Sequence, residues 1–138
     1  MQDTDPIMLV EDDIVDAMTV KRALKELNIL NTVVHANNGE EALVYLKDQT
    51  KPKPCIILLD INMPKMNGIE FLKKAREQHD LSTIPVVMLT TSGNDRDILA
   101  SFHLNVAGYM VKPVDYREFV ETIRTIEGYW RMSRLPKA

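Results

Sequence analysis

The sequence predicts an α/β protein built on a doubly wound parallel sheet, in which five strands alternate with five helices. Short apolar segments alternate along the chain with longer segments whose apolar residues recur at helical spacing. Residues 56–59 and 86–89 are apolar without interruption, which is typical of strands covered by helices on both faces. This alternation favours successive strand–helix–strand units with right-handed crossovers.

Five short segments, rich in aliphatic and β-branched residues, define the expected strands. Each of them is followed directly by a polar or charged residue, which indicates where the strand leaves the sheet. We predict strands over residues 7–10, 32–36, 55–59, 85–89 and 107–111.

The intervening segments carry the apolar stripes expected of helices that lie on a sheet. The first helix should end near Asn28, the second should open at Asn38, and the fifth should begin near Asp115 as its N-cap. The expected buried faces, in chain order, are Ala17, Val20, Leu24 and Leu27; Ala42, Leu43 and Leu46; Ile69, Leu72 and Ala75; Ile98, Leu99 and Phe102; and Tyr116, Phe119, Ile123, Ile126 and Trp130.

Length and composition indicate one cytoplasmic domain. The 138 residues suffice for a core of their own, and a net charge of −3 argues against electrostatic binding to nucleic acid or an anionic membrane. The single cysteine, Cys55, excludes an internal disulfide and fits a reducing cytosol. The first residues do not resemble a signal peptide, and the apolar runs are too short to span a membrane.

Reactive side chains follow four of the five predicted strands. They are Glu11, Asp12 and Asp13 after the first strand, Asp60 after the third, Thr90, Thr91 and Ser92 at the fourth, and Lys112 and Pro113 after the fifth. Ligands of such sheets bind at the carboxyl ends of the strands, near the point where the strand order reverses. One acid in this position is often only a helix cap, whereas four matched strand ends indicate a shared site.

The charges of this site indicate what it binds. Like charges such as Glu11, Asp12 and Asp60 repel by on the order of 4 kcal/mol per pair at an intermediate dielectric. Lys112 offsets only part of this repulsion, so that a cation or a proton is required. Oxygen ligands with few side chains suit Mg²⁺. A metal beside a carboxylate, a lysine and a hydroxyl group is suited to phosphoryl transfer.

Four segments together resemble the CheY-like receiver domains of bacterial two-component response regulators. They are residues 8–13 (MLVEDD), 59–68 (LDINMPKMNG), 89–91 (LTT) and 110–113 (MVKP). The resemblance runs from about residue 7 to 126 and implies a flavodoxin-like (β/α)5 fold with strand order 2-1-3-4-5. It implies a single receiver domain over residues 1–138, with a C-terminal helix extension over about 127–138.

The resemblance also implies a function and a metal site. Asp60 matches the phosphoacceptor, a carboxylate nucleophile that becomes a 4-aspartylphosphate. Asp12 matches the direct Mg²⁺ ligand, Glu11 the acid that reaches the metal through water, and Asn62 the residue whose backbone carbonyl binds it. The chain would thus be a stand-alone response regulator that a sensor histidine kinase phosphorylates, and a phosphoacceptor switch rather than an enzyme.

Further residues match parts of the family's switch. Thr90 matches the hydroxyl that binds a phosphoryl oxygen and moves inward, Lys112 the lysine that neutralises the acyl phosphate, and Tyr109 an aromatic that changes rotamer. Pro113 would follow a cis peptide that places Lys112.

Other side chains near the site are expected to have supporting roles. Asp13 is expected to act as a charge in the first turn of the first helix. Gly68 should permit a turn, and Pro64 should stiffen the same loop. The side chains expected to tune access to the site are Asn62, Thr91 and Ser92.

The end of the chain suggests how the signal leaves the domain. The stripe of the last helix continues through Trp130 into an apolar tail, which predicts a homodimer through Phe119, Ile123 and Trp130. The tail resembles that of stand-alone receivers paired with phytochrome-type sensor kinases.

Two other functions remain open from the sequence. A phosphorelay intermediate would pass the phosphoryl group to a histidine phosphotransfer protein. A Mg²⁺-dependent phosphohydrolase resembling the haloacid dehalogenase family would require an Asp where this chain has Asn62. The spacing of His35, His79 and His103 is not typical of a metal site.

Overall fold

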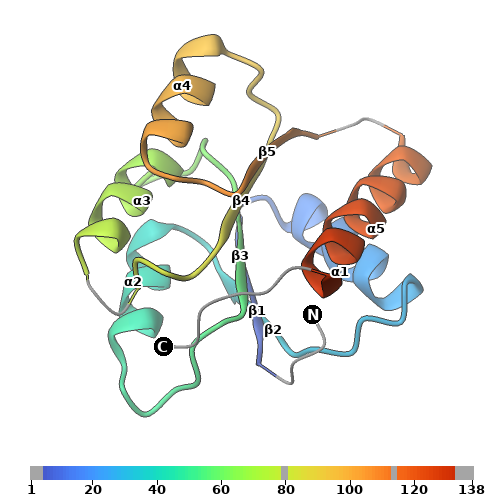
Figure 1. Cartoon of the computed structure of the whole chain (residues 1–138), viewed down its shortest axis with the longest axis horizontal. Coiled ribbons are helices and arrows are strands. Elements are labelled where there is room, and N and C mark those ends of the chain that lie inside the picture. Colours follow the sequence, from blue (N-terminus) through green and yellow to red (C-terminus); the bar gives the residue numbers. More distant parts are fainter. Residues whose placement is uncertain (1–4, 79–80, 113–114, 133–138) are drawn as a thin grey trace.

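The computed structural model describes residues 5–78, 81–112 and 115–132, and the side chains of these residues up to 128. Five strands alternate with five helices (Figure 1). The strands are β1 (Ile7–Val10), β2 (Val33–Ala36), β3 (Ile56–Leu59), β4 (Val86–Thr90) and β5 (Gly108–Val111). The helices are α1 (Ile14–Glu26), α2 (Gly39–Lys47), α3 (Gly68–Glu77), α4 (Asp95–His103) and α5 (Tyr116–Met132).

The strands form one parallel sheet in the order β2-β1-β3-β4-β5, which confirms the predicted fold and strand order. Helices α1 and α5 cover one face of the sheet, and α2, α3 and α4 lie on the other (Figure 1). Successive residues of a strand point to opposite faces. Ile7 and Leu9 therefore belong to the core under α1 and α5, whereas Met8 and Val10 belong to the core on the other side.

Short polar side chains fix the ends of the helices. Asn38 and Asn94 accept N-cap hydrogen bonds at α2 and α4, and Asn67 forms a capping box with Glu70 at α3. Beyond α1, Asn28 has a left-handed backbone with φ of 60°, which ends the helix at the predicted place.

Asp115 accepts a hydrogen bond from the N–H of Arg117 at 2.9 Å, which confirms it as the cap of α5. No described helix is long and apolar enough to cross a membrane.

The buried face of α5 agrees with the prediction, whereas that of α4 differs from it. Leu99 and Phe102 of α4 are 61% and 48% exposed, and of this helix only Ser101 is buried. This helix lies beside the edge of the sheet, where no other described element packs over Leu99 and Phe102. Phe119 and Ile123 of α5 pack in the core against the sheet, as predicted for the buried face of this helix, and the same burial keeps them out of the predicted dimer interface.

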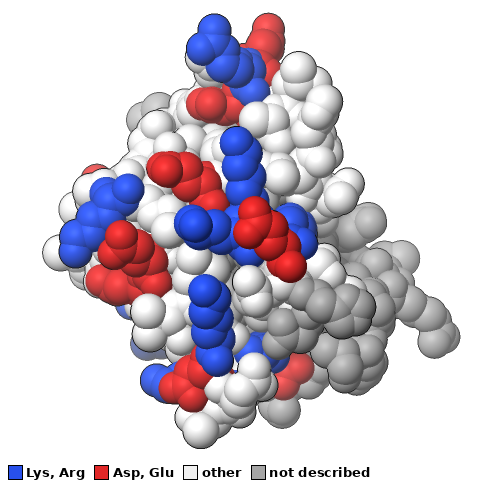
Figure 2. Space-filling model, turned by 90° about the vertical axis from the view of Figure 1, so that its left-hand side faces the viewer, with Lys and Arg blue, Asp and Glu red and all other residues white. Residues whose placement is uncertain are grey.

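Charged side chains of both signs are interspersed on the face that carries α2, α3 and α4. Figure 2 shows this side of the molecule, with Lys and Arg lying among Asp and Glu. Its described residues form no broad patch of one sign.

Gly68 lies against the main chain of Asp60. A Cβ atom at this position would lie 2.2 Å from the carbonyl oxygen of Asp60 and 2.9 Å from the Cα of Ile61. The N–H of Gly68 also donates to the carbonyl of Ile61 at 2.9 Å. Its φ is not positive, so close approach of α3 to the end of β3, rather than a special turn, requires glycine here.

We expect Gly68→Ala to lower the free energy of unfolding by about 2 kcal/mol or more, since the added methyl group must displace main chain. Urea unfolding measures this change. Gly128→Ala in α5 is the control, because its Cβ would have no neighbour within 4 Å. This variant should be stabilised by up to about 1 kcal/mol. Equal effects of the two substitutions would contradict the close approach.

Candidate functional site

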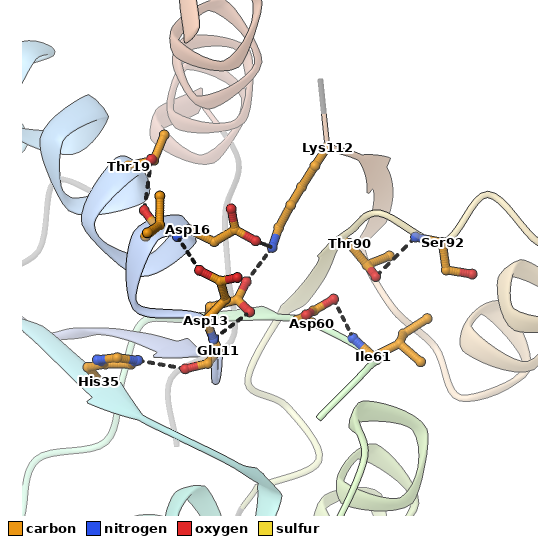
Figure 3. Close-up of polar contacts among 11 residues, drawn as sticks. Glu11, Asp13, Asp16, Thr19, His35, Asp60, Ile61, Thr90, Ser92 and Lys112 are labelled. Carbon is orange, nitrogen blue, oxygen red and sulfur yellow. Dashed lines mark hydrogen bonds and ion pairs between the residues drawn. The ribbon is translucent and has the colours of Figure 1, made fainter. Parts of the chain in front are cut away.

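The predicted site residues meet at the carboxyl ends of the strands (Figure 3). Val10 of β1 lies beside Leu59 of β3 in the sheet register, so the residues that follow them, Glu11 and Asp60, emerge side by side. The N–H of Asp60 donates to the carbonyl of Val10 at 3.0 Å and fixes this junction. Strand β2 lies on one side of β1 and β3 on the other, so the strand order reverses at this junction, which is where ligands of such sheets bind.

Three carboxylates converge at this junction. Carboxylate oxygens of Glu11, Asp12 and Asp60 all lie within 4.8 Å of one another. Glu11 and Asp60 are 1% and 7% exposed, whereas Asp12 is exposed to solvent. An all-oxygen, partly open set of acids fits a hard divalent cation that retains some of its water. The residues therefore fit the magnesium site that was predicted for them.

The surroundings of Glu11 raise the pKa of its carboxyl group. Burial raises its pKa, the hydrogen bond from Lys112 lowers it, and the negative charge of Asp60 raises it further. The net result is a pKa of about 7, compared with 4.5 for an ordinary glutamate. Without a metal ion, this carboxyl group therefore holds a proton over part of the neutral range.

Lys112 is bound to two carboxylates, neither of which belongs to Asp60. Its ammonium group pairs with the carboxylate of Glu11 and with Oδ2 of Asp16, the latter at 3.0 Å (Figure 3). Burial lowers the pKa of Lys112, but the hydrogen bond to Glu11 and the charge of Asp60 outweigh it and raise the pKa overall. Lys112 is therefore positively charged, and Glu11 and Asp16 share its charge.

The sequence reasoning missed Asp16. This residue lies in the first turn of α1, three positions after the N-cap Asp13, and its nearness in sequence to the acids that follow β1 could have placed it beside the site. Asp13 was expected to act as a charge in the first turn of α1; it lies just before that turn as the N-cap, and its side chain accepts from the N–H of Asp16 at 3.0 Å.

One oxygen of Asp60 already has a partner. Its Oδ1 accepts a hydrogen bond from the N–H of Ile61 at 2.8 Å. This bond orients the carboxylate and leaves the second oxygen, Oδ2, without a hydrogen bond to any described residue. A buried, oriented carboxylate with one available oxygen can act as a nucleophile.

Thr90 ends β4 on the other side of Asp60. It is fully buried, and its Oγ1 accepts a hydrogen bond from the N–H of Ser92 at 3.3 Å (Figure 3). The hydroxyl of Tyr109, from β5, donates to the carbonyl of Ser92 at 2.7 Å, and burial raises the pKa of this tyrosine. The predicted switch residues Thr90 and Tyr109 are thus joined through one loop residue.

Other predicted residues lie at the rim of the site. Asn62 and Thr91 are exposed beside Asp60 and Thr90. The cis peptide predicted before Pro113 and the residue His79 lie outside the described residues. His35 was not expected to bind a metal; its Nε2 lies 2.7 Å from the carbonyl oxygen of Glu11 and ties β2 to the turn after β1.

Comparisons with known proteins agree with this geometry. Residues 7–124 match the family model of the response regulator receiver domain. Response regulator Rcp1 of Synechocystis is 37% identical over 128 residues, which cover 90% of this chain and 87% of Rcp1. The solved Mn²⁺-bound form of Rcp1 matches with a TM-score of 0.88 and 36% identity, over 96% of this chain and 99% of that one.

The phosphorylated cyanobacterial phytochrome response regulator RcpA matches with a TM-score of 0.87 and 34% identity, over 96% of this chain and 99% of that one. The chain belongs to the response regulator receiver domain family. It is a two-component phosphoacceptor switch rather than an enzyme, and Glu11, Asp12 and Asp60 form its acidic divalent-cation pocket.

Glu11 should make the stability of the metal-free protein depend on pH. Its pKa rises from 4.5 to about 7 on folding, so the folded state binds this proton more tightly than the unfolded chain. The resulting stabilisation is complete below about pH 4.5 and is lost as the pH rises through about 7. We expect the free energy of unfolding, measured with urea in the presence of a chelator, to fall across this range.

Glu11→Gln is the control for this prediction, because glutamine does not titrate. Its free energy of unfolding should change less with pH than that of the wild type. Excess Mg²⁺ should remove most of the loss above about pH 7 in the wild type, since a cation favours the ionised carboxylate. Equal pH slopes in both proteins would show that Glu11 is not the group responsible.

Proposed function

We propose that the chain accepts a phosphoryl group from a histidine kinase on Asp60, with Mg²⁺ bound at Glu11, Asp12, Asp60 and the backbone carbonyl of Asn62. The observation that carries this proposal is the buried carboxylate of Asp60 within 4.8 Å of two other acids, with the nearby Lys112 paired to Glu11 and Asp16 rather than to Asp60. A site with this surplus of negative charge favours a divalent cation and a reaction that the cation assists.

The chain's own residues would divide the reaction among them. The free oxygen of Asp60 attacks phosphorus, and a new O–P bond forms as the P–N bond to the donor histidine breaks. Lys112 exchanges one of its two carboxylates for a phosphoryl oxygen, and the hydroxyl of Thr90 donates to another. A bound Mg²⁺ would supply the positive charge that lets the phosphoryl group approach the acids.

Two related structures support the metal and the modification. Rcp1 was solved with Mn²⁺, and RcpA in a phosphorylated form. Mg²⁺ rather than Mn²⁺ is our proposal for this chain, because it is the hard cation that oxygen ligands with open water positions prefer.

The start of α1 offers the kinase a surface beside the site. Ile14, Val15 and Met18 are apolar and exposed, and Met18 is 63% exposed. Val15 also lines a cavity of about 480 Å³ together with Asp16 and Lys112, which connects this surface to the phosphorylation site. An apolar surface next to a reactive group suits a partner that must bring its own reactive histidine there.

The partner and setting follow from the relatives. Structures named as phytochrome or bacteriophytochrome response regulators match this chain at 34% to 36% identity, so we propose a phytochrome-type sensor kinase as partner. We propose one cytoplasmic receiver domain with a core over about 7–126 and a helical extension over about 127–138. A stand-alone regulator is supported by Rcp1, of which the aligned residues cover 87%.

Self-association is part of the proposal, with an interface other than the predicted one. Phe119 and Ile123 are buried in the core, and the side chain of Trp130 lies outside those described. Leu99 and Phe102 of α4 provide an exposed apolar surface instead. The role of a phosphorelay intermediate uses the same site and is distinguished by transfer from Asp60 back to a histidine phosphotransfer protein.

We expect acetyl phosphate with Mg²⁺ to phosphorylate the wild type but not Asp60→Asn, because the amide is not a nucleophile for phosphorus. Intact-protein mass spectrometry measures the added group. Asp13→Asn is the matched control, since asparagine also serves as an N-cap and the side chain of Asp13 caps α1 through the N–H of Asp16. Labelling of Asp60→Asn at the wild-type level would refute the assignment.

Met18→Asp should slow phosphoryl transfer from a phytochrome-type kinase that phosphorylates the wild type, by about tenfold for a central contact residue. Its labelling by acetyl phosphate should be unchanged, because the small donor needs no docking surface. Val44→Asp replaces a similarly exposed apolar residue on α2 and should leave both reactions unchanged. A loss with both donors, or with both variants, would contradict docking at α1.

A further inference from the structure

Ser92 holds the loop between β4 and α4 by three kinds of hydrogen bond. Its N–H donates to Oγ1 of Thr90 at 3.3 Å, and its carbonyl accepts from the hydroxyl of Tyr109 at 2.7 Å. Its own hydroxyl donates to Oδ2 of Asp97 at 2.7 Å. One residue thus connects the switch hydroxyl, strand β5 and helix α4.

The bond to Asp97 is the strongest of these by its chemistry. A hydroxyl that donates to an ionised carboxylate forms a shorter and stronger bond than neutral partners do. Within the described part of the chain, this carboxylate forms no ion pair, so Ser92 is its principal side-chain partner. Asp97 lies in the first turn of α4 and is itself anchored there, because its carbonyl accepts from the hydroxyl of Ser101 at 2.8 Å.

We propose that the hydrogen bond between Ser92 and Asp97 is a latch, which holds this loop in its unphosphorylated position and opposes the movement of Thr90 toward a phosphoryl group on Asp60. Both residues are positioning residues that act through Thr90. The inference rests on the proposed function, because the latch matters only if Asp60 is the phosphoacceptor.

The direction of the effect follows from the connections. Thr90 is buried at the end of β4, and its hydroxyl must turn or shift to donate to a phosphoryl oxygen. Ser92 is only two residues away and bonded to that hydroxyl, so a shift of Thr90 pulls on the loop. The loop can follow only when the bond to Asp97 breaks or α4 moves with it. Bonds present only in the unphosphorylated state weaken binding of anything that requires the other state.

Two contacts of this network depend on the side chain at position 92: the bond that its hydroxyl donates to Asp97, and a longer one, at 3.4 Å, that the same oxygen accepts from the N–H of Asn94. Tyr109 bonds to the main chain, and so does Thr90, so both of these contacts would survive replacement of Ser92. Only the hydroxyl of Ser92 reaches Asp97. Substitutions in this pair should therefore change the free energy of the switch while Thr90 and Tyr109 themselves stay the same.

Binding of beryllofluoride with Mg²⁺, a stable analogue of the phosphoryl group, tests the latch. We expect Asp97→Ala to bind it about fivefold more tightly than wild type, the effect of losing one net hydrogen bond from the unbound state. Asp95→Ala is the matched control. Both acids lie in the first turn of α4 and interact alike with the helix dipole, but Asp95 makes no contact with Ser92.

A double-mutant cycle identifies the bond itself. Ser92→Ala should give the same gain as Asp97→Ala, and the two substitutions together should give no further gain, whereas Ser92→Ala and Asp95→Ala should act independently. Thermal unfolding of each variant accounts for changes in overall stability. Equal affinities of Asp97→Ala and Asp95→Ala, or additive gains, would overturn the latch. Failure of the wild type to bind beryllofluoride would instead refute the proposed function.

Discussion

The electrostatic imbalance at the end of the sheet governs the site. Three carboxylates lie within 4.8 Å of one another, two of them are buried, and the only described lysine that contacts the group is shared with Asp16. Burial makes this repulsion stronger than it would be in water. A proton on Glu11 or a divalent cation can offset the charge, and phosphorylation adds further negative charge that only the cation and Lys112 can balance. The negative charge that destabilises the site without a metal ion thus favours binding of the cation that assists the reaction.

The fold places these charges together and keeps them there. The register of β1 with β3 brings Glu11 and Asp60 side by side, and Gly68 lets α3 pack directly on the main chain of Asp60. On the other side of Asp60, the loop after β4 links the site to α4 and β5, because Ser92 is hydrogen-bonded to Thr90, Asp97 and Tyr109. A movement of Thr90 toward a phosphorylated Asp60 would therefore be passed to α4 through Ser92.

The features that could be predicted are those with a signal in the local sequence. The five strands lie within one residue of the predicted ranges, because uninterrupted apolar segments and their polar ends are local signals. The residues at strand ends were also predictable, since a parallel sheet brings them to one edge. Contacts between side chains of distant segments, such as Lys112 with Asp16, have no local signal. Local sequence likewise does not show which apolar stripe the fold will bury. Both Phe102 and Phe119 were expected to be buried, but Phe102 is exposed and Phe119 is buried.

The ionisation of Glu11 is the central quantity in this account, and a carboxyl ¹³C NMR titration of the labelled protein measures it directly. In metal-free protein, we expect the Glu11 signal to titrate with a midpoint near pH 7. With saturating Mg²⁺, the midpoint should fall below that of an ordinary glutamate, since the cation stabilises the ionised form. A midpoint near 4.5 in the metal-free protein, or one that Mg²⁺ does not move, would contradict the account.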